Sequence, residues 1–218
     1  MNIQSNFWDK FSTNKRNKYS LLIFIFFFVL SLFAEILSND KPIVLSIDDK
    51  LYFPIFISYT DKQFGGFFDT EADYKDEFIT SRLKEKSNWA IFPLNPHSYD
   101  SINISQSAPN PASPSVHNYL GTDDRGRDVL ARLIYGFRLS VLFAFALTAI
   151  GIIIGIFFGA IQGYFAGRVD LYMQRFIEIW SSMPYLDILI IFSSLFAPSV
   201  SFFIFLLSLF GWMGLSDY

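Results

Sequence analysis

Three stretches of the chain are nearly free of charged residues, and the segments between them hold most of the ionisable groups. These stretches cover residues 21–37, 139–165 and 200–215, and the first of them carries one charge, Glu35. A bilayer is spanned by roughly 17 to 25 consecutive apolar residues, so each stretch has about the length of a membrane helix. The pattern predicts an integral membrane protein with a large polar loop, residues 38–138, between the first two stretches.

The N-terminal segment predicts the orientation of the chain. Its first twenty residues include the basic side chains Lys10, Lys15, Arg16 and Lys18. A signal peptide also begins with a basic region, but here the apolar run is long and no A-x-A cleavage pattern follows it. We therefore expect a cytoplasmic tail over 1–20 and an uncleaved transmembrane helix over 21–37. The positive-inside rule then places the polar loop outside.

The polar loop reads as a small external domain followed by a linker, together covering residues 38–120. Residues 41–60 alternate β-branched or aromatic residues with turn formers, which predicts two short strands joined near Asp48 and Asp49. Residues 70–86 have the pattern of a helix. Residues 95–115 are rich in Pro, Ser and Asn and predict an extended linker without a core of its own.

Residues 121–138 predict an amphipathic elbow on the outer membrane surface. Thr122 or Asp123 can cap a helix N-terminus, and Asp128 and Arg132 have the i, i+4 spacing of an ion pair. The apolar positions fall on one face of the expected helix, namely Leu130, Leu133, Ile134 and Phe137.

The second apolar stretch, residues 139–165, predicts transmembrane helix 2 and carries glycines at a four-residue spacing. These are Gly151, Gly155, Gly159 and Gly163. At about 100° per residue they lie on one stripe, where another helix can approach closely. The alternative is that the membrane helix merely tolerates these glycines.

Residues 169–196 predict transmembrane helix 3 with a kink at Pro184. The carbonyl freed near Trp180 would need a partner such as a serine hydroxyl. Polar residues share one third of the helix circumference: Asp170, Gln174, Glu178, Ser181 and Ser182. Gln174, Glu178, Ser181, Ser182 and Pro184 are therefore candidates for the lining of a translocation pathway. The alternative is that the first part of the stripe is solvated at the cytoplasmic interface.

A further apolar run over 200–215 predicts transmembrane helix 4. The expected fold class is thus an all-α integral membrane protein with about four transmembrane helices and a small α+β external loop domain between helices 1 and 2.

Composition narrows the possible functions. The chain has 218 residues, of which 52% are hydrophobic and 27 are Phe, with a mean hydropathy of +0.34 and a net charge of −3. No basic block suggests nucleic-acid binding. There is no cysteine, and the two histidines, His97 and His117, do not have a metal-ligand spacing. No catalytic constellation or phosphate-binding loop emerges, so we expect neither an enzyme nor a bound metal or cofactor.

The block GTDDRGRDVLARLIYGFRLS, residues 121–140, resembles the permease subunits of dipeptide and oligopeptide ABC importers. The similarity continues through GAIQGYFAGRVDLYMQRFIEIWSSMP and FGWMGL, while FGGFFDTEADYKD and SYDSIN look like the subgroup that imports microcin C and related peptides. The motif positions that carry the resemblance in the elbow are Gly121, Thr122, Asp123, Gly126, Arg127, Asp128 and Arg132.

The resemblance implies a multi-pass protein of the bacterial inner membrane that forms part of a peptide translocation pathway. Its implied partners are a second permease subunit in a heterodimer, ATPase subunits that bind and hydrolyse ATP, and a periplasmic solute-binding protein. Such permeases have six helices and an EAA-type cytoplasmic loop after the fourth. That loop has no match in these residues, so the sequence is expected to be truncated before it. A non-transporting remnant, or an adaptor that binds partners through the external loop, is the alternative.

Overall fold

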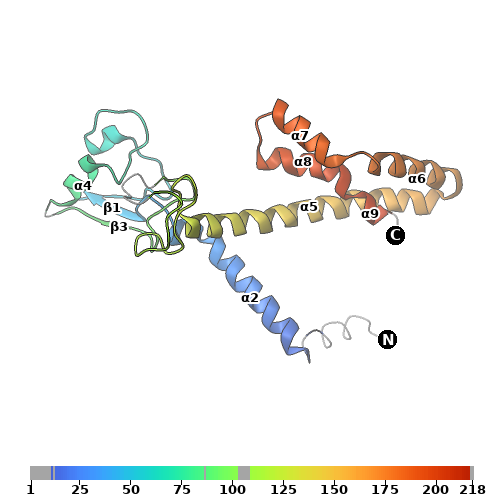
Figure 1. The fold of residues 1–218 in the computed structure, drawn as a ribbon, viewed down its shortest axis with the longest axis horizontal. Helices are drawn as coiled ribbons and strands as arrows, with labels where there is room; N and C mark the ends of the chain where they lie inside the picture. The colour runs from blue at the N-terminus through green and yellow to red at the C-terminus, as the bar shows by residue number, and fades with distance from the viewer. Residues whose placement is uncertain (1–10, 12, 86, 103–108, 217–218) are drawn as a thin grey trace. The chain divides into compact units, whose positions relative to one another are not determined.

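In the computed structural model, the described residues are 11, 13–85, 87–102 and 109–216. The chain divides into two compact units, residues 1–138 and 139–218. Figure 1 shows the order of the elements along the chain. Each unit is described by itself, and helix α5 (Val129–Phe165) contributes its first turns to unit 1 and the remainder to unit 2.

In unit 1, helix α2 (Lys15–Leu32) is followed by the short helix α3 (Ala34–Leu37). The side chain of Asn14 caps α2 by accepting a hydrogen bond from the N–H of Arg16 at 3.1 Å. The observed helix thus includes basic residues of the predicted tail over 1–20, and it breaks at Phe33, inside the predicted span 21–37. Lys10 lies outside the described residues.

The polar loop contains a three-stranded antiparallel sheet in the order β2-β1-β3. Strands β1 (Val44–Ile47) and β2 (Lys50–Tyr52) form the predicted hairpin, with Leu45 opposite Tyr52. Asp48 and Asp49 make its turn with positive φ values of 52° and 59°, a conformation that Asp tolerates better than most residues. The third strand, β3 (Trp89–Ile91), was not predicted.

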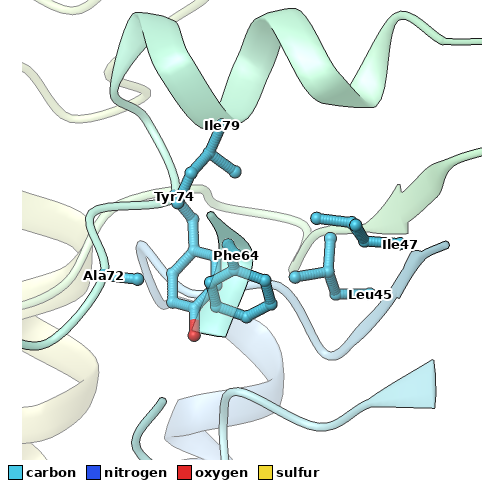
Figure 2. Close-up of a cluster of buried hydrophobic side chains, with 6 residues drawn as sticks. All are labelled: Leu45, Ile47, Phe64, Ala72, Tyr74 and Ile79. Atoms are coloured by element: carbon cyan, nitrogen blue, oxygen red, sulfur yellow. The ribbon is translucent and has the colours of Figure 1, made fainter. Parts of the chain in front are cut away.

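A hydrophobic core lies between β1, the 3-10 helix η1 (Asp61–Phe64) and helix α4 (Glu77–Leu83). Figure 2 shows the buried side chains, with the rings of Phe64 and Tyr74 side by side. These two ring centroids are 5.9 Å apart in an edge-to-face arrangement, which adds to the stabilisation from burial. The cluster consists of Leu45, Ile47, Phe64, Ala72, Tyr74 and Ile79. The predicted helix over 70–86 is therefore shorter than expected, because Ala72 and Tyr74 pack into the core before the helix begins.

Helix α5 runs without a break for 37 residues. This differs from the prediction of a separate elbow over 121–138 and a helix over 139–165. The residues before Val129 form turns, and the rest of the predicted elbow is the first part of the long helix. No Gly–Pro or Pro signal occurs between Leu130 and Phe165 to interrupt it.

Unit 2 continues with α6 (Gly167–Ser181), α7 (Tyr185–Leu195), α8 (Val200–Gly211) and α9 (Met213–Ser216). Helices α6 and α7 meet at a bend of 64°, at the position where Pro184 predicts a break. The prediction that a serine hydroxyl is the partner of the Trp180 carbonyl is wrong. The N–H of Met183 donates a hydrogen bond to that carbonyl at 3.2 Å.

One described helix, α5, is long and apolar enough to cross a membrane, and a second span results if the bent pair α6–α7 is one span. Helix α8 is apolar but shorter. The mostly helical fold with a small sheet agrees with the expected class. The count of four transmembrane helices stays a prediction.

Candidate functional site

The carboxylate of Asp128 is the centre of a buried polar network in unit 1. Its side chain is 1% exposed. One oxygen, Oδ2, accepts hydrogen bonds from Asn95 Nδ2 and from the N–H of Ala131, both at 2.8 Å. The other, Oδ1, accepts from Asn118 Nδ2 at 2.9 Å. Asp128 thereby caps the N-terminus of α5 and joins it to two loop segments.

Ser38 extends this network to the end of α3. Its hydroxyl donates to the carbonyl of His97 at 2.7 Å and accepts from Asn95 Nδ2 at 3.0 Å. The hydroxyl of Tyr135, in α5, donates to the carbonyl of Ser38 at 2.9 Å. The prediction of a linker without a core over 95–115 is therefore wrong for its first residues, since Asn95 and His97 are buried. Residues 103–108 lie outside the description.

Asp123 closes the loop that precedes α5. Its Oδ1 accepts from the N–H groups of Arg125 and Arg127, and its Oδ2 accepts from the Arg127 side chain, all at 2.9 Å. Arg132 also pairs with Asp123. Partial burial alone would raise the pKa of the Asp123 carboxyl, but the hydrogen bonds from Arg127 and Arg125 hold that pKa well below its usual range.

Two expectations for this motif are therefore corrected. The cap of the helix is Asp128, not Thr122 or Asp123, because the helix begins at Val129. The predicted pair of Asp128 with Arg132 is wrong, because Asp128 faces two buried amides while Arg132 reaches Asp123.

The two glycines of the motif occupy backbone conformations that residues with side chains rarely adopt. Gly121 has φ +77°, and a Cβ there would lie 2.3 Å from the carbonyl oxygen of Ala112. Gly126 has φ +80°. Thr122 holds the same turn, because its Oγ1 accepts from the N–H of Ala112 at 3.0 Å. These motif residues therefore have a structural role, because they hold the turn at the start of α5.

Titratable groups with altered pKa values lie beside the Asp128 network. Burial, together with the charge of Lys75, lowers the pKa of His97. Burial also lowers the pKa of Lys75, against the attraction of Asp40 and Asp73, and it raises the pKa of Asp40. His97 Nε2 lies 3.0 Å from the carbonyl oxygen of His117, so the neutral ring can donate a hydrogen bond there.

The glycine stripe of α5 faces the C-terminal helices of unit 2 along part of its length. A Cβ at Gly155 would lie 2.7 Å from Leu215 Cβ and 3.0 Å from the Trp212 carbonyl oxygen. At Gly159 the nearest atom is the carbonyl oxygen of Ser216 at 3.3 Å, and at Gly151 it is that of Gly211 at 3.6 Å. At Gly163 no atom lies within 4 Å, so this glycine is not explained by a close approach within the described chain.

A polar groove of about 550 Å³ lies in unit 2 beside the start of α6. Gln174 donates to Asp170 at 3.2 Å, and Arg175 pairs with Glu178 at 2.6 Å. The groove is lined by Gly159, Gln162, Gly163, Ala166, Asp170, Gln174, Ile177, Glu178 and Ser216. Gln162 is 6% exposed, and its Nε2 has no hydrogen-bond partner among the described residues.

The other candidate pathway residues lie elsewhere. Ser181 lines a second, mostly apolar groove of about 560 Å³ next to Gly151. The hydroxyl of Ser182 donates to the carbonyl of Ile179 at 2.7 Å, and Pro184 precedes α7. The structure thus brings Gln174 and Glu178 to one groove and does not bring the two serines into it. Whether either groove is part of a pathway stays a prediction.

Sequence reasoning missed three buried amides, Asn95, Asn118 and Gln162. Asn95 begins the segment rich in Pro, Ser and Asn, and Asn118 follows shortly after it, in a stretch where composition indicates only irregular structure. Gln162 stood between two glycines of the predicted stripe, and a polar residue in an apolar helix was the available signal. Among the described residues, no group of three His, Cys, Asp or Glu side chains could hold a metal ion.

Comparison with known proteins connects these features to a family. No family model matches the chain. Over 208 residues, 95% of this chain and 61% of the relative, it is 43% identical to the inner membrane ABC transporter permease protein YejE of Escherichia coli (strain K12). It is 40% identical to the peptidoglycan transport system permease protein YejE of Agrobacterium fabrum, with 95% and 60% covered. A shorter match, 36% identical over 56% of this chain and 38% of the relative, is the dipeptide transport system permease protein DppC of Bacillus subtilis.

The chain spans about three fifths of the length of its first two relatives. These relatives carry the names of permeases, which agrees with the expectation of a transport component rather than an enzyme. Together with the long apolar helix α5, they support an inner-membrane protein. Along nearly its whole length, the chain is therefore a relative of ABC transporter permease proteins, and over about half of its length also of a dipeptide transport permease.

Proposed function

We propose that the chain is a transmembrane permease component of an ATP-driven peptide import system and forms part of its translocation pathway. The observation that carries this proposal is the 43% identity over 208 residues to an inner membrane ABC transporter permease. Sequence identity at this level over 95% of the chain extends through the external segment as well as the helices. The apolar helix α5 and the polar groove of α6 are compatible with a membrane route.

In this proposal the chain crosses the inner membrane several times, with its N-terminus in the cytoplasm. The basic residues Lys15, Arg16 and Lys18 precede the apolar part of α2, and the positive-inside rule assigns them to the cytoplasm. The sheet and α4 then lie outside, and the turn between α5 and α6 lies inside. Gln174 and Glu178 line the inner part of the route, and Ser181, Ser182 and Pro184 mark its bend.

The proposed partners are a second permease subunit, ATPase subunits that bind ATP, and a periplasmic solute-binding protein. Two of the named relatives carry the names of a peptidoglycan and a dipeptide transport system. The shared chemistry of these names is the peptide, so a peptide is the proposed cargo, with microcin C-like peptides as the narrower expectation.

Affinity purification of the tagged chain from membranes of its own cells tests this proposal. ATPase and permease subunits should be recovered with it in stoichiometric amounts. The control is an identically tagged membrane protein of unrelated function, which should recover neither. Purification of the chain without either kind of subunit would contradict the proposed function.

A further inference from the structure

The segment over residues 59–72, which contains η1, folds back on itself and carries one buried and two exposed phenylalanines. Its two arms are joined by backbone hydrogen bonds from Asp61 to Thr70 at 3.0 Å and from Lys62 to Phe68 at 3.1 Å. Phe64 is 1% exposed and lies in the core, as Figure 2 shows. Phe67 and Phe68 are 86% and 67% exposed. We call this exposed pair the aromatic tip.

The conformation of the aromatic tip is fixed by the chain itself. Asp61 Oδ2 accepts hydrogen bonds from the N–H groups of Phe67 and Phe68, at 3.0 Å and 3.2 Å. A Cβ on Gly66 would lie 1.9 Å from that same oxygen, so a larger residue here would displace the Asp61 carboxylate. Arg82 fastens the base of the segment, because its Nη1 donates to the carbonyl of Phe64 at 2.5 Å. A surface held in one conformation loses little entropy when a partner binds.

An exposed pair of phenylalanines held in this way has no role in the core of unit 1. Clusters of exposed apolar side chains mark interaction surfaces more often than isolated ones do, and aromatic residues are enriched at protein interfaces. The adjoining groove, of about 280 Å³, includes a third ring, Phe78, which is 38% exposed. The tip therefore offers an apolar contact beside a recess of side-chain size.

Charge defines the kind of partner. The groove beside the tip is lined by four carboxylates, Asp61, Glu71, Asp73 and Asp76, and none of its described lining residues is basic. Glu71 pairs with Lys41 at 2.5 Å, whereas Asp73 and Asp76 enter no ion pair among the described residues. A Lys or Arg side chain that enters this groove would meet both carboxylates and aromatic faces.

We propose that the aromatic tip and its acidic groove are a docking surface for the solute-binding protein, which contributes an apolar patch for Phe67 and Phe68 and a basic side chain for Asp73 and Asp76. This assignment rests on the proposed function, since it requires that residues 59–78 lie outside the membrane and that the transporter uses a solute-binding protein. The docking contact is made by residues 61–78 of unit 1, which include the start of α4 but none of the long apolar helices.

The test measures binding of the purified solute-binding protein, with and without peptide, to the full chain and its partner subunits in lipid nanodiscs. The double variant Phe67→Ser/Phe68→Ser should weaken binding by about tenfold or more, as for aromatic interface anchors. Asp76→Lys should weaken it and reduce the salt dependence between about 50 and 500 mM salt. The matched control is Val116→Ser, an equally exposed apolar residue (83%) of the same unit, which should bind as the parent does.

If the parent binds the solute-binding protein and the tip variants bind it more weakly while resisting proteolysis like the parent, the docking surface is supported. Equal binding by the parent, the double variant and Asp76→Lys would overturn the docking surface and leave the proposed function intact. A parent complex that retains its ATPase subunits but does not bind the solute-binding protein would also overturn it. A photoreactive residue at position 67 gives a readout that removes no native contact elsewhere: it should cross-link to the solute-binding protein, and cross-linking to lipid or to a second copy of the chain would contradict the assignment.

Discussion

Asn95 donates a hydrogen bond to the buried carboxylate of Asp128 across 2.8 Å, although 33 residues separate them. Asn118 donates to the same carboxylate. Replacing Asp128 with Ala would leave both amides and the N–H of Ala131 without this acceptor. Each buried donor without a partner costs about 1 to 3 kcal/mol, and the cost is smaller where water enters and replaces the acceptor. We therefore expect Asp128→Ala to lower the free energy of unfolding of unit 1 by about 2 to 4 kcal/mol.

Limited proteolysis of the full chain in detergent measures this effect as faster cleavage within the loop region. Asp124→Ala is the control, since this neighbouring carboxylate is exposed. Equal cleavage rates for both variants would show that the Asp128 network does not hold the loop.

The glycines of α5 supply an internal comparison. Gly155→Leu should destabilise unit 2 by about 1 to 3 kcal/mol, because its side chain would overlap Leu215 and the backbone at Trp212. The side chain of Gly163→Leu would extend into open space. Because Leu has a higher helix propensity than Gly, we expect no loss of stability for this variant. Thermal unfolding in detergent distinguishes the two variants. If the unfolding temperature of Gly163→Leu falls as far as that of Gly155→Leu, partner proteins, rather than α8 and α9, provide the contacts that require glycine along the stripe.

The stability of the loop domain should depend on pH through His97. Its pKa is lowered from 6.5 in the folded chain, so the unfolded state binds the proton more readily. Stability from this group is therefore fully present above about pH 6.5 and declines as the pH falls below it. Hydrogen exchange of the β1 and β3 amides between pH 7.5 and 5.5 should show decreasing protection, after correction for the intrinsic exchange rate.

His97→Asn provides the control for this measurement. The variant should be less stable at neutral pH, because the contact with the carbonyl of His117 is altered, but its protection should vary less with pH. If the parent and His97→Asn lose protection in parallel, the neighbouring Lys75 and Asp40 account for the pH dependence instead.

The predicted topology can be examined with single cysteines, because the chain has none of its own. Ser107, an obvious position in the loop, lies outside the described residues, whereas Val116 is 83% exposed. An impermeant maleimide should label Val116→Cys in intact cells. It should label Arg168→Cys, in the first turn of α6, only after permeabilisation. Labelling in the reverse order would invert the proposed orientation.

The sequence was informative where local chemistry decides structure. The alternation around Asp48 and Asp49 predicted the β1–β2 hairpin, and Pro184 predicted the break between α6 and α7. Local signals were insufficient where distant residues meet. The cap of α5 is Asp128 because Asn95 and Asn118 reach it from other segments, and helix capping patterns alone could not distinguish it from Asp123.

The same limit applies to the polar stripe of α6. Helical spacing placed Gln174 and Glu178 on one face, and both line a single groove. Ser181, at the end of the same helix, lines the other groove, and the hydroxyl of the C-cap Ser182 donates to the carbonyl of Ile179. Helical spacing alone cannot show this difference. Gln162 enters the groove from α5, so only the packing of two helices reveals it.

Peptide uptake is the most direct measure of the central claim that this chain is a component of a peptide importer. Cells in which the gene for the chain is deleted should lose ATP-dependent accumulation of a labelled oligopeptide, and the restored gene should return it, while uptake of an unrelated sugar is unchanged. Undiminished peptide accumulation in the deleted cells, with other peptide importers also removed, would contradict the account.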